Sequence, residues 1–120
     1  MRILKFRAWC DVCQSFQPIM GIIHQDDKGI TIYCPMHEGG AIECEVNQFT
    51  GLQDSKGVDI YESDIVEHSD TKGFPSLSIG VIEWDEYRAQ FSHSRYSEEY
   101  LSGKVLTVIG NIYEDKDLIK

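Results

Sequence analysis

The fold is decided by a stretch in the middle of the chain, Gln48-Phe49-Thr50-Gly51-Leu52-Gln53-Asp54-Ser55-Lys56-Gly57-Val58-Asp59-Ile60-Tyr61-Glu62-Ser63-Asp64-Ile65-Val66. Short apolar and aromatic segments at residues 48–50, 59–61 and 65–66 are separated here by polar residues. The tetrapeptide Asp-Ser-Lys-Gly at residues 54–57 is typical of a chain reversal, because its glycine can take a positive φ. The stretch therefore predicts short strands that are joined by tight turns.

Similar patterns predict further strands on the N-terminal side. Residues 2–9 alternate between apolar and polar side chains, as the residues of a half-buried strand do. Residues 16–24 and 30–34 are rich in β-branched and aromatic side chains and flank a turn, so we expect these two segments to pair. Residues 41–46 alternate again and predict another strand.

The C-terminal side adds strands and only short helical pieces. Residues 77–84 change the parity of their alternation near Gly80, where we predict a bulge within one strand. Residues 105–109 are apolar enough to lie centrally in a sheet. Short helical pieces are predicted around residues 97–101 and 114–119, because no window of eleven or more residues keeps a helical apolar period.

Many short strands with frequent turns predict a mainly β chain that forms a barrel or a sandwich. Charge is divided unevenly along it. Residues 1–45 carry 4 basic and 6 acidic side chains, whereas residues 46–120 carry 7 basic and 14 acidic side chains. This asymmetry predicts two subdomains that meet near residue 46, the second of which is markedly acidic.

Length and charge exclude several classes of function. The 120 residues suffice for an ordinary core, so folding is not expected to require metal or disulfides. A net charge of −9 disfavours general binding to nucleic acid or to anionic membranes, because phosphate groups would be repelled. Charges near the N-terminus interrupt any signal-peptide core, and no apolar stretch would span a bilayer. We therefore expect a cytoplasmic protein.

The cysteines form the strongest chemical motif. Cys10 and Cys13 make one pair, and Cys34 and His37 make a second pair with the same two-residue spacing. Two such pairs can close a tetrahedral zinc site, and Cys44 could replace His37 as the fourth ligand. Small or glycine residues that suit a tight zinc turn follow only the second pair. The alternative is that these are unlinked thiols, some of them buried as small apolar side chains.

Other catalytic patterns are missing from the sequence. His24, His68 and His93 have no neighbouring nucleophile, so we interpret them as surface or satisfied histidines. Adjacent carboxylates such as Asp85 and Glu86 point to opposite faces of a strand, and such doublets are usually solvated turns. No phosphate-binding loop, calcium loop or nucleophile elbow occurs. The protein is therefore not expected to be an enzyme.

Aromatic residues crowd the second half of the chain. Rings at strand positions belong mostly to cores, but small barrels also use them in peptide-binding grooves. If exposed beside the neighbouring acids, these rings would suit a basic partner. The candidate binding residues are Trp84, Glu86, Tyr87, Tyr96, Glu98, Glu99 and Tyr100.

Five segments in order along the chain carry a family resemblance. They are Met1-Arg2-Ile3-Leu4-Lys5-Phe6-Arg7-Ala8-Trp9, Gln48-Phe49-Thr50-Gly51-Leu52-Gln53-Asp54, Gly57-Val58-Asp59-Ile60-Tyr61-Glu62-Ser63-Asp64-Ile65-Val66, Gly80-Val81-Ile82-Glu83-Trp84 and Val108-Ile109-Gly110-Asn111-Ile112-Tyr113-Glu114. Together they resemble the signature blocks of the YopX family of phage and prophage proteins. The resemblance spans nearly the full chain and is more specific than any single motif above.

This resemblance implies a mainly β fold with a C-terminal SH3-like small barrel, placed at residues 46–120, after a smaller N-terminal β-rich segment at residues 1–45. It implies self-association, but it assigns no activity, because the family is uncharacterised. Cys10 and Cys13 do not belong to the shared pattern of the family, so a zinc site would belong to a subset. Ser63 stands where the family prefers glycine and would cost about 1 kcal/mol if that position needs a positive φ.

We therefore predict a non-enzymatic protein-binding or accessory module of a phage, acting in the host cytoplasm on an unidentified host or phage protein. No cofactor is expected apart from the structural zinc considered above. One alternative is an acidic DNA mimic that inhibits a host nucleic-acid enzyme, which requires carboxylates spaced like backbone phosphates. Another is a zinc-ribbon protein associated with nucleic acid, which requires bound zinc and a basic face near Arg2, Lys5 and Arg7.

Overall fold

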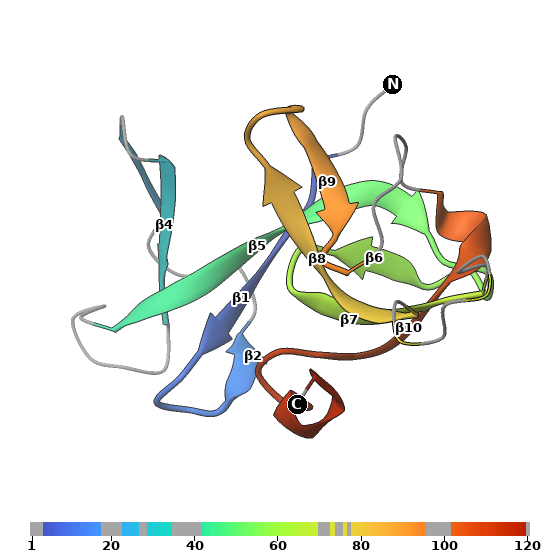
Figure 1. The fold of residues 1–120 in the computed structure, drawn as a ribbon. Coiled ribbons are helices and arrows are strands. Elements are labelled where there is room, and N and C mark those ends of the chain that lie inside the picture. Colours follow the sequence, from blue (N-terminus) through green and yellow to red (C-terminus); the bar gives the residue numbers. More distant parts are fainter. Residues whose placement is uncertain are drawn as a thin grey trace. The chain divides into compact units, whose positions relative to one another are not determined.

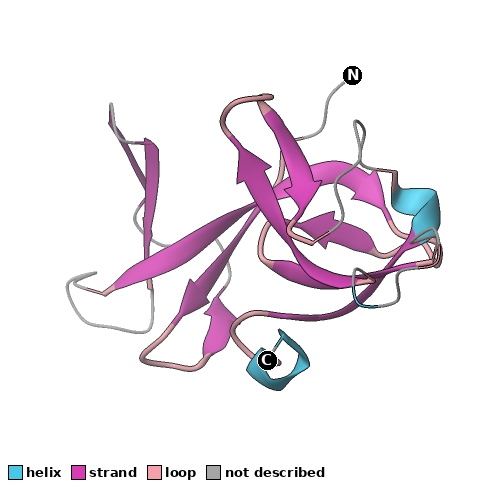
Figure 2. Cartoon of the chain, viewed as in Figure 1, coloured by secondary structure: helices cyan, strands magenta, loops and turns pink. Residues whose placement is uncertain are grey.

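The computed structural model confirms a mainly β protein (Figure 2). Its helical segments within the described residues are two short 3-10 helices, η3 (Gly103–Val105) and η4 (Lys116–Ile119). The chain divides into two compact units, one over Leu4–Gln48 and one that begins at Phe49. The structure describes residues 4–17, 23–26, 29–34, 42–69, 73, 76, 78–95 and 102–119.

The first unit is built on antiparallel strands. The strands are β1 (Phe6–Cys10), β2 (Ser15–Gln17), β3 (Ile23–Asp26), β4 (Gly29–Tyr33) and the first part of β5 (Glu43–Gln53). They are ordered β2-β1-β5-β4-β3, so β5 lies in the centre between β1 and β4. The predicted segment 16–24 contributes to two strands, because β2 pairs with β1 whereas β3 pairs with β4.

The second unit is an SH3-like small barrel (Figure 1). The end of β5 pairs with β6 (Asp59–Tyr61) across the turn predicted at residues 54–57. The other strands, in the order β10-β7-β8-β9, are β7 (Asp64–His68), β8 (Ile79–Asp85), β9 (Gln90–His93) and β10 (Leu106–Asn111). Alternating side chains point inward, and Ile60, Val66, Ile82 and Leu106 form the buried core.

The chain after β5 closes the barrel against β10. The backbone N–H of Ser55 donates to the carbonyl oxygen of Leu106 at 2.9 Å. The carboxylate of Asp54 is only 6% exposed and accepts the N–H of Val108 at 2.9 Å. Gly103 lies so close to the carbonyl oxygen of Gln53 that a Cβ atom would collide with it. The closure of the barrel therefore depends on the buried carboxylate of Asp54 and on the absence of a side chain at Gly103.

Two sequence-based predictions about this unit are wrong. The register of β7 with β8 runs through Val66↔Gly80 without a bulge. Gly80 is instead required by packing, because a Cβ atom there would meet the ring of His93. The apolar segment 105–109 was predicted to lie centrally, but β10 lies at one end of the four-strand order, where residues 54–55 cover its outer edge.

The turn between β6 and β7 confirms the expectation at Ser63. This residue has a φ of 72°, a conformation that a side chain disfavours. The Asp64 carboxylate accepts the backbone N–H of Tyr61 at 2.8 Å and fixes the turn. The helix predicted around residues 114–119 appears as η4, whereas residues 97–101 lie outside the described ranges. In the described part of the chain, no helix is long and apolar enough to cross a membrane.

Candidate functional site

The hairpin of β8 and β9 presents aromatic side chains at the surface of the barrel. Trp84 lies opposite Phe91 in the strand register. The two rings meet edge to face, with centroids 5.0 Å apart and planes at 71°. Trp84 nevertheless remains 45% exposed, and Tyr87 in the following turn is 101% exposed. One predicted ring is therefore held in place by a strand neighbour, and the other projects into solvent.

Asp85 fixes the turn that carries Tyr87. Its Oδ1 atom accepts the backbone N–H groups of Tyr87 and Arg88 at 3.0 and 3.2 Å. The Arg88 Nε atom lies 3.9 Å from the Asp85 Oδ2 atom, and Ala89 closes the turn with a φ of 52°. An Asp carboxylate that accepts the backbone N–H of the residue two positions later commonly stabilises such a turn. The tip of the hairpin is thus a defined structure.

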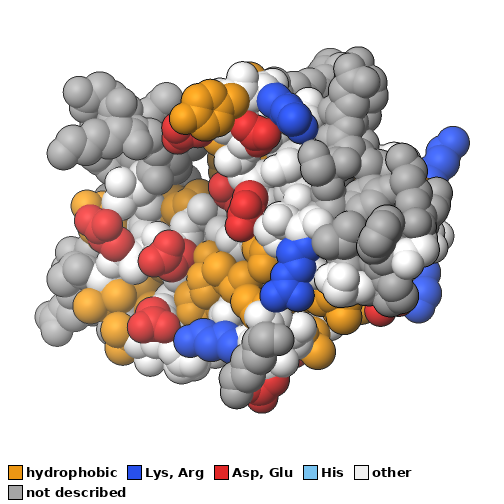
Figure 3. All heavy atoms as spheres, in the orientation of Figure 1, with side chains coloured by type: hydrophobic (Ala, Val, Ile, Leu, Met, Phe, Trp, Pro, Cys, Tyr) orange, Lys and Arg blue, Asp and Glu red, His pale blue; other side chains and the backbone are white. Residues whose placement is uncertain are grey.

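Charged residues neighbour these rings along the chain, and the exposed Arg88 is among them. Glu83 on β8 and Glu86 in the turn are both exposed. Figure 3 shows hydrophobic and acidic side chains together over the tip of this hairpin. The structure thus brings together three of the seven predicted binding residues, Trp84, Glu86 and Tyr87. The other four, Tyr96, Glu98, Glu99 and Tyr100, lie outside the described residues.

A second cluster lies in the first unit, where the predicted zinc ligands meet. The Sγ atoms of Cys10, Cys13 and Cys34 all lie within 4.8 Å of one another. Cys10 ends β1, Cys13 follows in the turn to β2, and Cys34 follows β4. Cys10 and Cys34 are fully buried and Cys13 is half-buried, and none of these three described cysteines forms a disulfide. His37, the fourth predicted ligand, lies outside the described residues.

The turn between Cys10 and Cys13 forms without the glycine that the sequence analysis considered favourable. Gln14 takes the left-handed conformation, with a φ of 55°. Its side-chain amide donates to the carboxylate of Asp11 at 3.0 Å, which holds the turn. The backbone N–H of Cys13 consequently points back and donates to the Cys10 Sγ atom at 3.4 Å. A sulfur that accepts such a bond is better able to carry negative charge.

The thiols affect one another's ionisation. The hydrogen bond with the Cys10 side chain is the largest effect that raises the pKa of Cys13 to about 12, and burial and Cys34 add to it. Burial raises the pKa of Cys44 to about 11, and the nearby thiols of Cys34 and Cys10 raise it further. Cys44 therefore shares the environment of the other three. Crowded thiols remain protonated, and a bound cation would reverse that preference.

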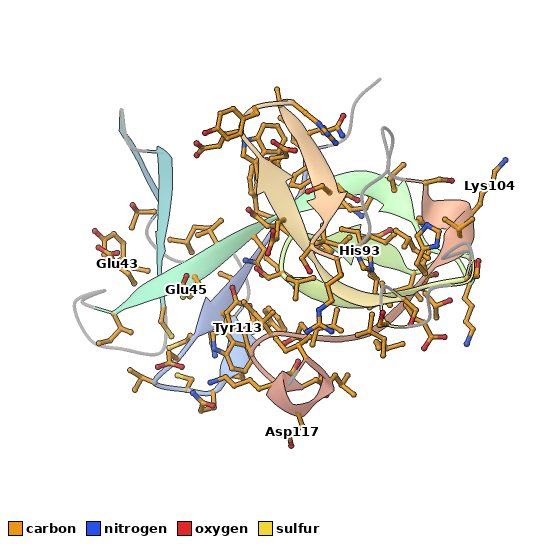
Figure 4. The ribbon with its side chains drawn as sticks, in the orientation of Figure 1. Glu43, Glu45, His93, Lys104, Tyr113 and Asp117 are labelled. Carbon is orange, nitrogen blue, oxygen red and sulfur yellow. The ribbon has the colours of Figure 1, made fainter. Side chains whose placement is uncertain are left out.

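His68 and His93 lie inside the barrel (Figure 4 labels His93). Their rings meet edge to face with centroids 6.2 Å apart. The His93 Nδ1 atom accepts the backbone N–H of Arg95 at 3.1 Å, and its Nε2 atom lies 3.3 Å from the carbonyl oxygen of Ser78. His93 is thus a buried histidine whose two ring nitrogens have hydrogen-bond partners. This is one of the two interpretations drawn from the sequence, the other being a surface histidine.

Comparison with known proteins now identifies the family. The family model described as YopX protein matches residues 5–120, which is nearly the whole chain. The chain belongs to the YopX family. No curated protein matches it. The family resemblance drawn from the five sequence segments is therefore confirmed.

A solved structure shares the fold. The crystal structure of protein EF1440 from Enterococcus faecalis is similar with a TM-score of 0.70 and 22% sequence identity, and the match covers 100% of each chain. At this level of identity the likeness shows the fold alone. The two units of this YopX chain therefore follow an architecture also observed by crystallography.

Sequence reasoning missed the two residues that organise the hairpin. Asp85 was taken only as part of a turn and of an acidic surface, yet its carboxylate sets the backbone that carries Tyr87. The packing of Phe91 against the Trp84 ring was not predicted. The first had a usable signal, because Asp at the start of a turn often accepts backbone N–H groups. The second had none, because cross-strand register is not written in the sequence.

Proposed function

We propose that this protein is a non-enzymatic binding module of a phage, which acts in the host cytoplasm and docks through its β8–β9 hairpin onto another protein. The observation that carries the proposal is the exposure of Trp84 and Tyr87 on one fixed hairpin. Large aromatic rings are enriched among the residues that dominate binding energy at protein interfaces. A ring that is fully exposed contributes little to the core and is accessible to a partner.

The rigidity of the hairpin supports this proposal. Association costs free energy when loops and side chains must be ordered at the interface. The bonds from Asp85 to the backbone of Tyr87 and Arg88 already order the turn before any partner arrives. The contact between Trp84 and Phe91 likewise restricts the larger ring. A preorganised hairpin loses less entropy on binding than a mobile loop would.

The charge around the rings specifies the chemistry of the partner. Glu83, Glu86 and Arg88 are exposed on this hairpin, and Asp85 lies beside Arg88, so the three acids leave the hairpin net negative. Rim charges of this kind steer association and favour partners of opposite charge. The partner is accordingly a protein with an apolar pocket for the rings and basic residues around that pocket.

A photo-crosslinking experiment tests this proposal. A benzophenone amino acid replaces Tyr87, and the matched control carries it at Val58, which is 48% exposed in the same barrel. We expect position 87 to crosslink a specific host or phage protein that position 58 does not reach. Identical crosslinks from both positions, or none from position 87, would contradict the proposal.

Binding to the purified partner provides the quantitative test. We expect Tyr87→Ala to weaken the affinity by about 30-fold, as the loss of a central aromatic residue does. Glu86→Lys should slow association most at low salt, because it reverses a steering charge. Val58→Ala is the control and should leave the affinity unchanged. An affinity unaffected by Tyr87→Ala would remove the hairpin as the binding site.

A further inference from the structure

All four cysteines of the chain converge in the first unit, although they are spread over 35 positions of sequence from residue 10 to residue 44. The strand order explains why, since β1, β5 and β4 are direct neighbours. The β1–β5 register ends at Trp9↔Glu45, and one further step places Cys10 opposite Cys44. Across β5, the backbone N–H of Cys34 donates to the carbonyl oxygen of Ile42 at 2.8 Å.

Cys44 belongs to the same cluster as the other thiols. Its burial alternates with the exposed Glu43 and Glu45, which Figure 4 labels on β5, so the Cys44 side chain faces the interior of this unit. It packs with Cys10 and Cys34 in one buried group, and Cys13 lies against that group. Burial raises the pKa of Cys44, and the neighbouring thiols of Cys34 and Cys10 add to that effect. The Sγ atoms of Cys10, Cys13 and Cys34 lie within 4.8 Å of one another, and Cys44, which lies outside that set, packs in the same buried group.

The spacing of the sulfur atoms matches a metal site better than a disulfide. The Sγ atoms of Cys13 and Cys34 lie 3.8 Å apart. A disulfide requires about 2.05 Å between its sulfur atoms. A tetrahedral zinc ion with Zn–S bonds of about 2.3 Å requires about 3.8 Å between any two of its sulfur ligands. The observed separation therefore corresponds to an edge of the zinc tetrahedron.

We propose that Cys10, Cys13, Cys34 and Cys44 bind one structural Zn²⁺ ion. Soft thiolate ligands in a tetrahedral set select zinc over hard cations such as Mg²⁺ and Ca²⁺. Each thiol that coordinates the ion releases its proton to solvent. The backbone N–H of Cys13, which points at the Cys10 sulfur, then stabilises a coordinated thiolate.

Such an ion would stabilise a unit whose core is small. Among the described residues of the first unit, one buried cluster consists of Ala8, Cys10, Ile32, Cys34 and Cys44, and three of these five are cysteines. Domains of this size usually need a metal, disulfides or association to be stable. The expectation that folding needs no metal was based on the length of the whole chain. The division into two units changes that expectation for residues 4–48.

Metal analysis of the purified chain tests the proposal. We expect one zinc per chain after growth in zinc-supplemented medium. Cys13→Ser, at the least buried of the four thiols, and Cys44→Ser should each lower the zinc affinity by at least about 100-fold, more than outer-shell changes cost. Val12→Ser is the matched control, because Val12 is 62% exposed in the same turn, and it should keep the zinc.

Cobalt substitution of the wild-type chain keeps the test valid even if a variant fails to fold. We expect Co²⁺ to give the intense sulfur-to-cobalt charge-transfer bands and the tetrahedral d–d bands of a four-thiolate site. A chain that binds neither zinc nor cobalt would overturn the proposal. Loss of zinc in His37→Ala with retention in Cys44→Ser would overturn the assignment of Cys44 as the fourth ligand.

Discussion

The substitution Asp54→Asn probes the closure of the barrel. The Asp54 carboxylate is almost completely buried and accepts three backbone N–H groups. Its Oδ1 atom binds the N–H of Lys56 at 2.8 Å and of Val58 at 2.9 Å, and its Oδ2 atom binds that of Val108 at 2.9 Å. Asparagine has nearly the same shape but only one acceptor. If the asparagine Oδ1 atom keeps the bonds to the N–H groups of Lys56 and Val58, the asparagine NH₂ group must face the N–H of Val108.

The loss in free energy of unfolding that Asp54→Asn should cause can be worked out from these hydrogen bonds. A hydrogen bond to a charged group contributes about 1.5–3 kcal/mol, and an unsatisfied buried donor costs about 1–3 kcal/mol. The lost hydrogen bond and the unsatisfied donor both concern the N–H of Val108, so their costs are not simply added. We expect Asp54→Asn to lower the free energy of unfolding of the barrel by about 3 kcal/mol. Asp59→Asn is the matched control, because Asp59 accepts an exposed side-chain amide from Gln53 and is not buried. Its effect should stay within about 0.5 kcal/mol.

The pH dependence gives the same experiment a second readout. Burial favours the neutral form of Asp54, but the N–H donors of Val108, Val58 and Lys56 outweigh it and lower its pKa below the ordinary 3.8. A lowered pKa in the folded state stabilises the fold above the unfolded-state pKa, and this contribution disappears as the pH falls through the folded-state value. The difference between wild type and Asp54→Asn should therefore be constant above about pH 5 and shrink below it.

The assay uses the two tryptophans of the chain as separate reporters. Trp9 lies in the first unit and Trp84 in the barrel, so fluorine-labelled tryptophan gives one NMR signal for each unit. Urea unfolding followed by the Trp84 signal at pH 7 and pH 3 measures the barrel alone. A change below 0.5 kcal/mol at pH 7, or a difference independent of pH, would refute the role given to Asp54.

Three further predictions follow from the described contacts. Gly103→Ala should destabilise the barrel by about 3 kcal/mol in urea unfolding, because its Cβ would collide with the Gln53 carbonyl oxygen; an unchanged midpoint would contradict the closure described here. Ser63→Gly should stabilise it by about 0.5–1 kcal/mol by relieving the left-handed strain, and a lower midpoint would argue against that strain. Removal of zinc by a chelator should lower the unfolding midpoint reported by Trp9 more than that reported by Trp84, and the opposite order would be inconsistent with a metal in the first unit.

The fold could be predicted largely from local patterns. Alternation, turn residues and the polar tetrapeptide at residues 54–57 identified most strands, because these signals depend on neighbours in sequence. The bulge predicted at Gly80 was wrong because both faces of β8 are partly covered, so a change of parity marks no change of register. The need for glycine at that position comes from His93, which is distant in sequence and close only in the folded barrel.

The candidate sites could be predicted only in part, for a similar reason. The spacing of Cys10 and Cys13 was visible in the sequence, but the approach of Cys44 depends on the pairing of β5 with β1 and β4. The exposure of Tyr87 could not be distinguished from burial by composition, since aromatic residues usually enter cores. Tyr87 is exposed because it lies in a turn that the Asp85 carboxylate holds in place.

The central claim is that the β8–β9 hairpin is the surface that binds a partner. The most direct test is a titration of the chain labelled with fluorinated tryptophan with the partner captured by crosslinking. We predict that the fluorine signal of Trp84 shifts on binding while that of Trp9 stays unchanged, and that Tyr87→Ala weakens the response. A shift of the Trp9 signal alone, or binding that moves neither signal, would contradict the claim.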